Sequence, residues 1–319
     1  MARATTSSSV HRRSNIWVHV AAIVAVTAWG ISFINTRVLL DYGFTPVQVY
    51  VFRCAIAYAL LLAFSHKHLR ALNPRHEWLF LLSGICGGSV YFVAENAALL
   101  YTSTTNVSLI TSTSPLINAL LVGMLYKDER PGRGIVIGSL IAMVGVGMVI
   151  LGGTSAPHGE EGSEPLGLGI LGDSLSLLAA VCWSVYALLL RKLQAFYSAL
   201  YVTRKTFFYG LLTSIPFLLL EPSKITLATF AEPSVWINLL TLALIASSLA
   251  FVMWAWVISR LGAVKAGNYL YFQPIVTLIF GVIVLHEGFS ALGITGCVLT
   301  ILGVYCGERL SEERRRLHH

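Results

Sequence analysis

The chain has 319 residues, of which 56% are hydrophobic and only 12% are charged, and its formal net charge at pH 7 is +7. Soluble globular domains carry about 25% charged residues, because charges keep a folded surface hydrated. The composition therefore excludes a water-soluble domain. The basic residues lie in short tracts between long apolar runs and at the two ends, a placement that excludes a nucleic-acid-binding surface and is typical of membrane topology.

Ten apolar runs approach the length of about 20 residues that a helix needs to cross a bilayer. In chain order, the predicted spans are 16–36, 46–64, 77–100, 105–126, 134–152, 168–190, 199–220, 235–258, 267–286 and 290–308. The stretch 153–167, rich in glycine, serine and glutamate, is predicted to be a linker at the midpoint of the chain. The sequence predicts an all-α integral membrane protein with ten transmembrane helices.

Lysine and arginine are distributed very unevenly between the two ends of these spans. If the N-terminus is cytoplasmic, 19 of the 22 Lys and Arg residues lie on the cytoplasmic side, as the positive-inside rule requires. We therefore expect cytoplasmic tails at 1–15 and 310–319, the second ending in what looks like a tag remnant. All five cysteines lie inside apolar runs without a metal-like spacing, so neither a disulfide nor a metal site is predicted.

The two halves of the chain repeat the same landmarks in the same order. Trp29 matches Trp183, and Pro115 in the fourth span matches Pro274 in the ninth. Each half holds five spans, an odd number, so the second copy is expected to enter the membrane upside down. Inverted repeats place a substrate site near the midplane, between the halves. The two repeats are assigned to 16–152 and 168–309.

Several short patterns follow one another in the first half: W-G in the first span, an arginine in the second, A-L-x-Y-T-S and S-x-x-x-x-x-x-P in the third and fourth, and K-D-E-R before a glycine-rich fifth span. Over residues 16–309 the chain resembles the EamA group of the drug/metabolite transporter superfamily, and within it the YddG-type amino-acid exporters. The resemblance implies a ten-helix carrier that exports metabolites, often amino acids, across the bacterial inner (cytoplasmic) membrane. Trp254 departs from the repeat, since it stands where the first half has Glu95.

Hydroxyl residues cluster in the fourth span, with Ser108 and Ser112 on the same face as Pro115. Proline frees a backbone carbonyl, which hydroxyls or water must satisfy inside a membrane. We predict that the two serines contact a substrate; the alternative is that small residues allow close helix packing. Polar residues in the matching stretch of the ninth span are predicted to face the same cavity: Asn268, Tyr271 and Gln273.

Aromatic residues recur at inner positions of the spans, at Trp29, Tyr91, Trp183 and Trp254. Trp and Tyr usually mark the membrane interfaces, but Trp29 and Trp183 lie in mid-span at equivalent repeat positions. We predict that these aromatic side chains line the wall of a binding cavity for a substrate with an apolar side chain. The alternative is that they pack against other helices or face lipid.

Glu95 and Arg53 are charged residues within predicted spans. Each lies six or seven residues below the outer end of its span, at about 9–10 Å depth for a rise of ~1.5 Å per residue. Charges inside a bilayer are costly, and they pair or line water. We predict that Arg53 keeps Glu95 ionised and that the pair guides substrate or gates its exit; the alternative is a purely structural ion pair.

The sequence contains no phosphate-binding loop and no metal or catalytic cluster, so we expect no cofactor, no ATP drive and no enzymatic activity. The prediction is a secondary transporter that exports small metabolites, above all amino acids, by alternating access. Its expected partners are the small-molecule substrate and the lipid bilayer. The sequence does not determine the oligomeric state, and it is compatible with a monomer. The alternatives are a multidrug cation/proton antiporter, a carrier of nucleotide sugars or phosphorylated metabolites, and a membrane-embedded enzyme or lipid scramblase.

Overall fold

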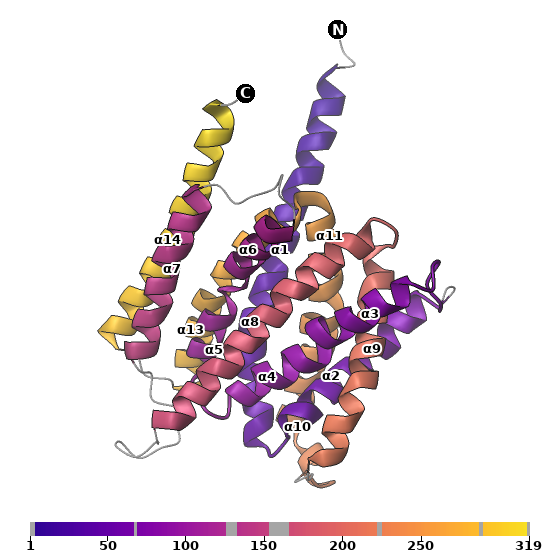
Figure 1. Cartoon of the computed structure of the whole chain (residues 1–319). Coiled ribbons are helices and arrows are strands. Elements are labelled where there is room, and N and C mark those ends of the chain that lie inside the picture. The colour runs from indigo at the N-terminus through magenta and orange to yellow at the C-terminus, as the bar shows by residue number, and fades with distance from the viewer. Residues whose placement is uncertain are drawn as a thin grey trace.

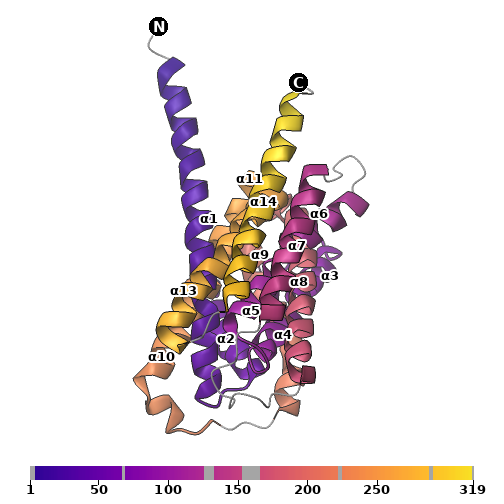
Figure 2. The same cartoon turned by 90° about the vertical axis from the view of Figure 1, so that its left-hand side faces the viewer.

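The computed structural model describes residues 4–66, 69–125, 133–152, 166–221, 225–286 and 290–317. In these ranges every regular element is a helix. The helices form one bundle, and both termini lie at the same end of it in the two views (Figure 1 and Figure 2). Most of the predicted linker and the whole K-D-E-R motif lie outside the described ranges.

The first half holds the first five predicted spans. Two of them are interrupted: a π-helical stretch lies within the third, and a break of two residues divides the fourth. The elements are α1 (Ala4–Asp41), α2 (Pro46–Phe64), α3 (His76–Gly84), η1 (Ile85–Ser89), α4 (Val90–Ala98), α5 (Thr104–Thr111), α6 (Ser114–Leu125) and α7 (Arg133–Gly152). Helix α1 reaches back to Ala4, so residues 4–15 of the predicted N-terminal tail continue the first helix.

The second half repeats these interruptions in its own third and fourth spans, the eighth and ninth of the chain. The elements are α8 (Leu166–Gln194), α9 (Ala199–Leu220), η3 (Thr229–Ala231), α10 (Pro233–Leu240), η4 (Thr241–Leu249), α11 (Ala250–Leu261), α12 (Ala263–Gly267), η5 (Asn268–Phe272), α13 (Gln273–Leu285) and α14 (Ala291–Leu317). The stretches η1 and η4 are π-helical, and η5 is a 3-10 helix.

Seven helical segments are long and apolar enough to cross a membrane, judged by length and composition over the described ranges. They are Ile16–Asp41, Pro46–Phe64, His76–Ala98, Thr104–Leu125, Leu168–Gln194, Pro233–Leu261 and Lys265–Leu285. Two further apolar helices are shorter, Val136–Gly145 and Ala291–Gly303. The remaining predicted span is α9, whose first turns contain the buried Arg204 and Lys205. The structure therefore supports a multi-pass helical protein, and the count of ten crossings stays a prediction.

Residues at the helix ends explain where several helices begin and stop. Thr45 and Gln48 form a reciprocal capping box at the start of α2, with Pro46 in the first turn. This arrangement satisfies two backbone N–H groups that a helix start leaves free. Helix α11 ends at Gly262, whose φ of 80° is a conformation that glycine adopts without a steric penalty.

Helices α7 and α14 form a closely packed pair at one side of the bundle (Figure 1). A Cβ added to Gly145 would lie 2.5 Å from the Thr300 Oγ1 atom, and one added to Gly303 would lie 2.7 Å from the Gly138 carbonyl oxygen. Only glycine permits so close an approach of two helices. Gly145 and Gly303, in the predicted fifth and tenth spans, are thus packing residues.

Candidate functional site

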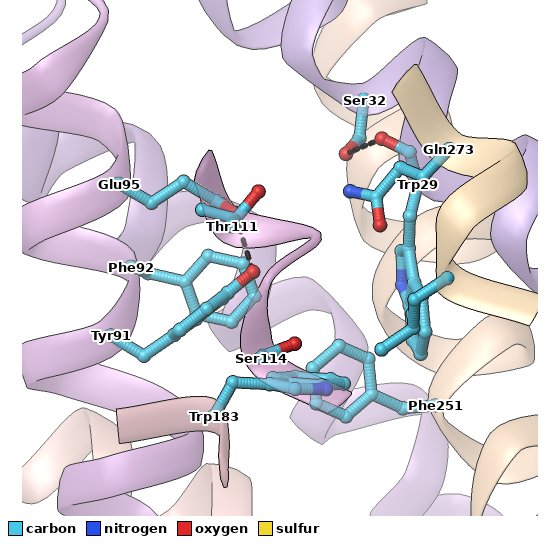
Figure 3. A pocket seen from close by; sticks show the side chains of 11 residues that line it. Trp29, Ser32, Tyr91, Phe92, Glu95, Thr111, Ser114, Trp183, Phe251 and Gln273 are labelled. Atoms are coloured by element: carbon cyan, nitrogen blue, oxygen red, sulfur yellow. Dashed lines mark hydrogen bonds between the residues drawn. The ribbon is translucent and has the colours of Figure 1, made fainter. Parts of the chain in front are cut away.

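A cavity lies in the middle of the bundle, where elements from both halves meet (Figure 3). It encloses about 370 Å³ of empty space, part of it open to the outside. We call it the first cavity; its lining residues are Trp29, Ser32, Tyr91, Phe92, Glu95, Thr111, Ser114, Trp183, Phe251, Leu270 and Gln273. Neither half could form this site alone.

One wall of the first cavity is the α4 face that carries its acidic group. Glu95 is 5% exposed and accepts a hydrogen bond from the hydroxyl group of Tyr91, one turn earlier in the same helix. The Tyr91 ring packs against Trp183 of α8, with 5.1 Å between ring centroids. The predicted residues Tyr91, Glu95 and Trp183 are therefore brought together, and the carboxyl group lies among aromatic rings.

The break in the fourth span forms the back of the cavity. Pro115 has no N–H group, so a carbonyl in the preceding turn loses its helical partner. Hydroxyl groups bond to carbonyls one turn further back: Thr111 Oγ1 donates to the Val107 oxygen at 2.8 Å, and Ser112 Oγ donates to the Ser108 oxygen at 2.6 Å. These are not the carbonyl that Pro115 frees, which is that of Thr111, four residues earlier. The satisfaction of that carbonyl by hydroxyl groups stays a prediction.

The ninth span is interrupted next to the same place. Pro274 lies in the first turn of α13, and the carbonyl four residues earlier is that of Leu270. Ser112 Oγ lies 3.3 Å from this carbonyl oxygen and donates to it. Gln273 lines the cavity on the side opposite Glu95 (Figure 3), is 6% exposed, and its amide group makes no hydrogen bond with the described residues. The two breaks thus face one another across the interface between the halves.

Four aromatic side chains close the cavity at one end; we call them the aromatic layer. The ring centroids of Trp29 and Trp183 are 5.2 Å apart in an edge-to-face arrangement, and Trp29 stands in the same relation to Trp254. Phe251 completes the layer, 5.7 Å from Trp183. The indole N–H of Trp29 donates to the Ala246 carbonyl oxygen at 2.9 Å. Trp29 and Trp183 therefore face the cavity and not the outer surface of the bundle.

A second, smaller cavity adjoins the other side of the aromatic layer. It encloses about 220 Å³ and is lined by Ser114, Pro115, Asn118, Trp183, Ser184, Ala187, Trp254, Ala263, Gly267 and Leu270. None of these residues is acidic or basic. Ser114, Trp183 and Leu270 line both cavities. A molecule passing between the two cavities would have to displace the Trp183 side chain.

The structure corrects the predicted pairing of Arg53 with Glu95, because each side chain has other partners. The Arg53 Nε atom donates to Ser247 Oγ at 2.8 Å, and its guanidinium group lies over the ring of Phe92, 4.5 Å from the centroid. Glu95 is bonded instead to Tyr91, and no ion pair links Arg53 to Glu95 among the described residues. The π-helical η4 presents Ser247 to Arg53, and the Phe92 ring occupies the side of the guanidinium group.

Other predicted residues lie beside the cavity and not in its lining. Ser108 Oγ accepts a hydrogen bond from Thr277 Oγ1 at 3.0 Å, a contact between α5 and α13. Ser112 supports the two helix breaks, as described above. Asn268 and Tyr271 line neither cavity, because the 3-10 turns of η5 place Leu270 there. Trp254 lines the second cavity only.

Sequence reasoning missed several lining residues: Ser32, Phe92, Thr111, Ser114 and Phe251. Thr111 and Ser114 belong to the same hydroxyl cluster as the predicted serines, so that cluster was a usable signal. Phe92 and Phe251 each follow a π-helical stretch, where the 3.6-residue period of the α-helix does not predict the inward face. Where the structure is described, no group of three His, Cys, Asp or Glu residues could hold a metal ion.

A separate charged cluster joins the two halves away from both cavities. Lys205 Nζ of α9 lies 2.8 Å from the Glu77 carboxylate of α3, and the Tyr209 hydroxyl group donates to the same carboxylate at 2.5 Å. The thiol groups of Cys86 in η1 and Cys182 in α8 also lie within hydrogen-bonding reach. These contacts hold η1 and α3 against the second half of the chain.

Comparisons with known proteins agree with this architecture. The model of the EamA-like transporter family matches residues 16–151 and 170–306. An uncharacterized transporter of Archaeoglobus fulgidus is 27% identical over 91% of this chain and 97% of its own length. The uncharacterized transporter YetK of Bacillus subtilis is 23% identical over 93% of this chain and 87% of its own.

A plant protein and a solved structure extend these similarities. The protein WALLS ARE THIN 1 of Arabidopsis thaliana is 25% identical over 94% of this chain and 86% of its own length. A solved crystal structure matches 95% of this chain and 99% of that chain with a TM-score of 0.68 at 18% sequence identity. This likeness shows a shared fold.

Proposed function

This chain belongs to the EamA-like transporter family of the drug/metabolite transporter superfamily, and from that premise we propose that it is a secondary carrier exporting amino acids and related small zwitterions. The family match shows a duplicated multi-pass membrane transporter. The substrate, the direction of transport and the mechanism of alternating access are the proposal.

The proposed substrate class is supported by the residues that line the first cavity. It holds one carboxyl group, that of Glu95, among the rings of Tyr91, Trp183 and other aromatic residues, and no lysine or arginine lines it. A buried carboxylate binds an ammonium group by a charge-assisted hydrogen bond, and aromatic faces attract cations. Phosphorylated metabolites and nucleotide sugars would need basic residues in that place, so they fit poorly.

The arrangement of the two cavities supports alternating access. We propose that the aromatic layer is closed here, and that rocking of one half against the other opens it. With ten spans, inverted repeats and both termini in the cytoplasm of a bacterial cell, the first cavity faces outward. The second cavity then lies toward the cytoplasm, beside Ala263 and Gly267 and near the basic residues Arg260 and Lys265.

The test is counterflow in liposomes that contain the purified carrier. Labelled amino acids, a lipophilic cation and a sugar nucleotide are each offered to liposomes loaded with the same unlabelled compound. We expect accumulation of amino acids. Exchange of the sugar nucleotide, or of none of the amino acids, would overturn the proposed substrate class.

A multidrug cation/proton antiporter is the second candidate, because Glu95 among aromatic rings also suits a lipophilic cation and a proton in turn. The measurement that separates the two is the response to a pH gradient. An antiporter would accumulate the lipophilic cation when the gradient is imposed and would release protons on addition of the cation. The amino-acid carrier would do neither.

A further inference from the structure

The first cavity has two chemically different sides. Glu95 and Tyr91 of α4 form the acidic side, and Gln273 lies across from them, with Thr111 and Ser114 between (Figure 3). The acidic side suits an ammonium group. The opposite side contains only neutral donors and acceptors, and its function is not explained by an ammonium group alone.

Two helices begin at this second side. Helix α6 starts at Ser114 and contains 12 residues, and α13 starts at Gln273 and contains 13 residues. Pro115 and Pro274 at these starts have no N–H group, and the Gln273 N–H group donates to the Leu270 carbonyl oxygen. The contribution of the helix starts is therefore the helix dipole, which makes that end electropositive. In transporters, interrupted helices direct such ends at anionic groups of the substrate. Both helix starts line the first cavity.

The side chains at these two helix starts are free to bind a ligand. The Gln273 amide group and the Ser114 hydroxyl group belong to residues that are 6% and 2% exposed, and neither makes a hydrogen bond with the described residues. Both side chains line the first cavity, so a ligand bound there can reach their polar groups. A carboxylate placed between these groups would satisfy them, and no competing acidic residue lines this side.

We propose that the first cavity binds α-amino acids in one orientation, with the ammonium group at Glu95 and the carboxylate group at the start of α13, where Gln273 selects for it. The apolar side chain then lies against the aromatic layer. The inference rests on the proposed function, and it adds a carboxylate subsite and a specificity-determining residue. Amines without a carboxylate group are poor substrates for this reason.

The test compares matched ligands. The twenty standard amino acids are first screened by counterflow, and for one that exchanges, its amide and its N-acetyl derivative are then measured as competitors. The amide keeps the ammonium group and loses the carboxylate charge, whereas the N-acetyl derivative keeps the carboxylate. We expect the wild-type carrier to bind the amino acid at least about 10-fold more tightly than either derivative, since each lacks one charge-assisted contact.

Variants then assign each subsite to its residue. Gln273→Leu is expected to raise the KM for the amino acid about 10-fold, the scale of a lost hydrogen bond to a charged group, and to leave the inhibition constant of the amide unchanged. Gln273→Glu should reverse the preference, so that the amide competes better than the amino acid. Gln194→Leu is the matched control, because Gln194 is a partly buried glutamine that lines neither cavity.

The outcomes separate the two proposals. If wild-type carrier exchanges no amino acid, the proposed function fails. If amino acids exchange but the amide competes as well as the acid, or if Gln273→Leu weakens the acid and the amide equally, the carboxylate subsite alone is wrong. Should Gln273→Leu not fold, Gln273→Glu and Gln273→Asn provide the same comparison between acid and amide.

Discussion

The two cavities are built from equivalent parts, yet only one of them contains a charge. In the first, the helix with Trp29 and Gly30 lies against the start of α13, and Thr277 Oγ1 donates to the Gly30 carbonyl oxygen at 3.0 Å. In the second, the helix with Trp183 and Ser184 lies against the start of α6, and Ser184 Oγ donates to the Ser114 carbonyl oxygen at 2.8 Å. Duplication thus produced two similar frameworks.

The difference lies in one position. The first half has Glu95 in its third span, and the repeat places Trp254 at the matching position of the second half. Glu95 lines the larger cavity and Trp254 lines the smaller one, where its ring packs on Trp29. The first cavity thus has a carboxyl group in its lining, and the second cavity has an indole ring at the corresponding position. The comparison teaches that one exchange within a repeat accounts for the carboxyl group in the lining of the first cavity and for its absence from the lining of the second.

Removal of the charge should have the largest effect on transport. Loss of one partner from a buried charged pair costs about 2–5 kcal/mol, so Glu95→Gln is expected to lower substrate affinity by roughly 30-fold or more. Counterflow in liposomes measures it. Adding Trp254→Glu to this variant should not restore exchange, because the second cavity is smaller, about 220 Å³, and Gln273 at the start of α13 does not line it. Normal exchange by Glu95→Gln would show that the two cavities do not differ in function.

Removal of the shared indole should join the cavities. Trp183→Ala is expected to lower the stability by about 3–5 kcal/mol, as large-to-small core substitutions of aromatic residues do. It should also let substrate leak from loaded liposomes without exchange. Trp183→Phe keeps a ring in the aromatic layer and serves as the control. If liposomes that contain the Trp183→Ala variant do not leak substrate and exchange it normally, another group separates the cavities.

Glycine substitutions test how closely each helix start is packed. A Cβ on Gly30 would lie 2.7 Å from the Val276 Cβ atom and 3.0 Å from the Gln273 carbonyl oxygen, whereas one on Gly267 would lie 3.0 Å from Pro115 Cβ. Overpacking costs about 1–3 kcal/mol, so Gly30→Ala should lower the melting temperature more than Gly267→Ala. Gly169→Ala is the control, because nothing lies within 4 Å of its added Cβ. The reverse order would contradict the described packing.

The smallest effect is expected from the two equivalent hydrogen bonds. Hydrogen bonds between membrane helices contribute about 0.6 kcal/mol on average, so Ser184→Ala and Thr277→Val should each lower the melting temperature slightly and by similar amounts. Exchange rates should stay within about threefold of wild type, since about 1.4 kcal/mol corresponds to a tenfold change and about 0.6 kcal/mol to less than half of that on the logarithmic scale. A large loss in only one of the two variants would mean that the equivalent contacts are not equivalent in energy.

Much of the framework could be predicted from the sequence. The repeat identified Trp29, Trp183 and the two prolines as matching positions, and all of them lie at the cavities or at the helix starts beside them. Gln273 was predicted because an amide group is costly in lipid. These predictions succeed because hydropathy, proline and repetition act locally along the chain.

Contacts that depend on helix geometry could not be predicted. Equal depth in the membrane suggested that Arg53 and Glu95 pair, but depth does not fix the rotation of a helix about its axis. The structure directs Arg53 to Ser247 and to the Phe92 ring. Phe251 was missed for the same reason, since the π-helical stretch before it changes which face points inward.

The two π-helical stretches determine which side chains the third and eighth spans turn toward the cavities. A π-helical turn spans one more residue between hydrogen-bonded partners than an α-helical turn does. Deleting one residue from Ile85–Ser89 would turn Tyr91 and Glu95 by about 100° relative to the start of the helix, since each residue adds that angle at 3.6 residues per turn, and would remove the acid from the cavity. A deletion in Thr241–Leu249 would displace Phe251 and Trp254 in the same way. Because both halves contain such a stretch in corresponding spans, the same backbone irregularity sets the inward face of the third span in each half.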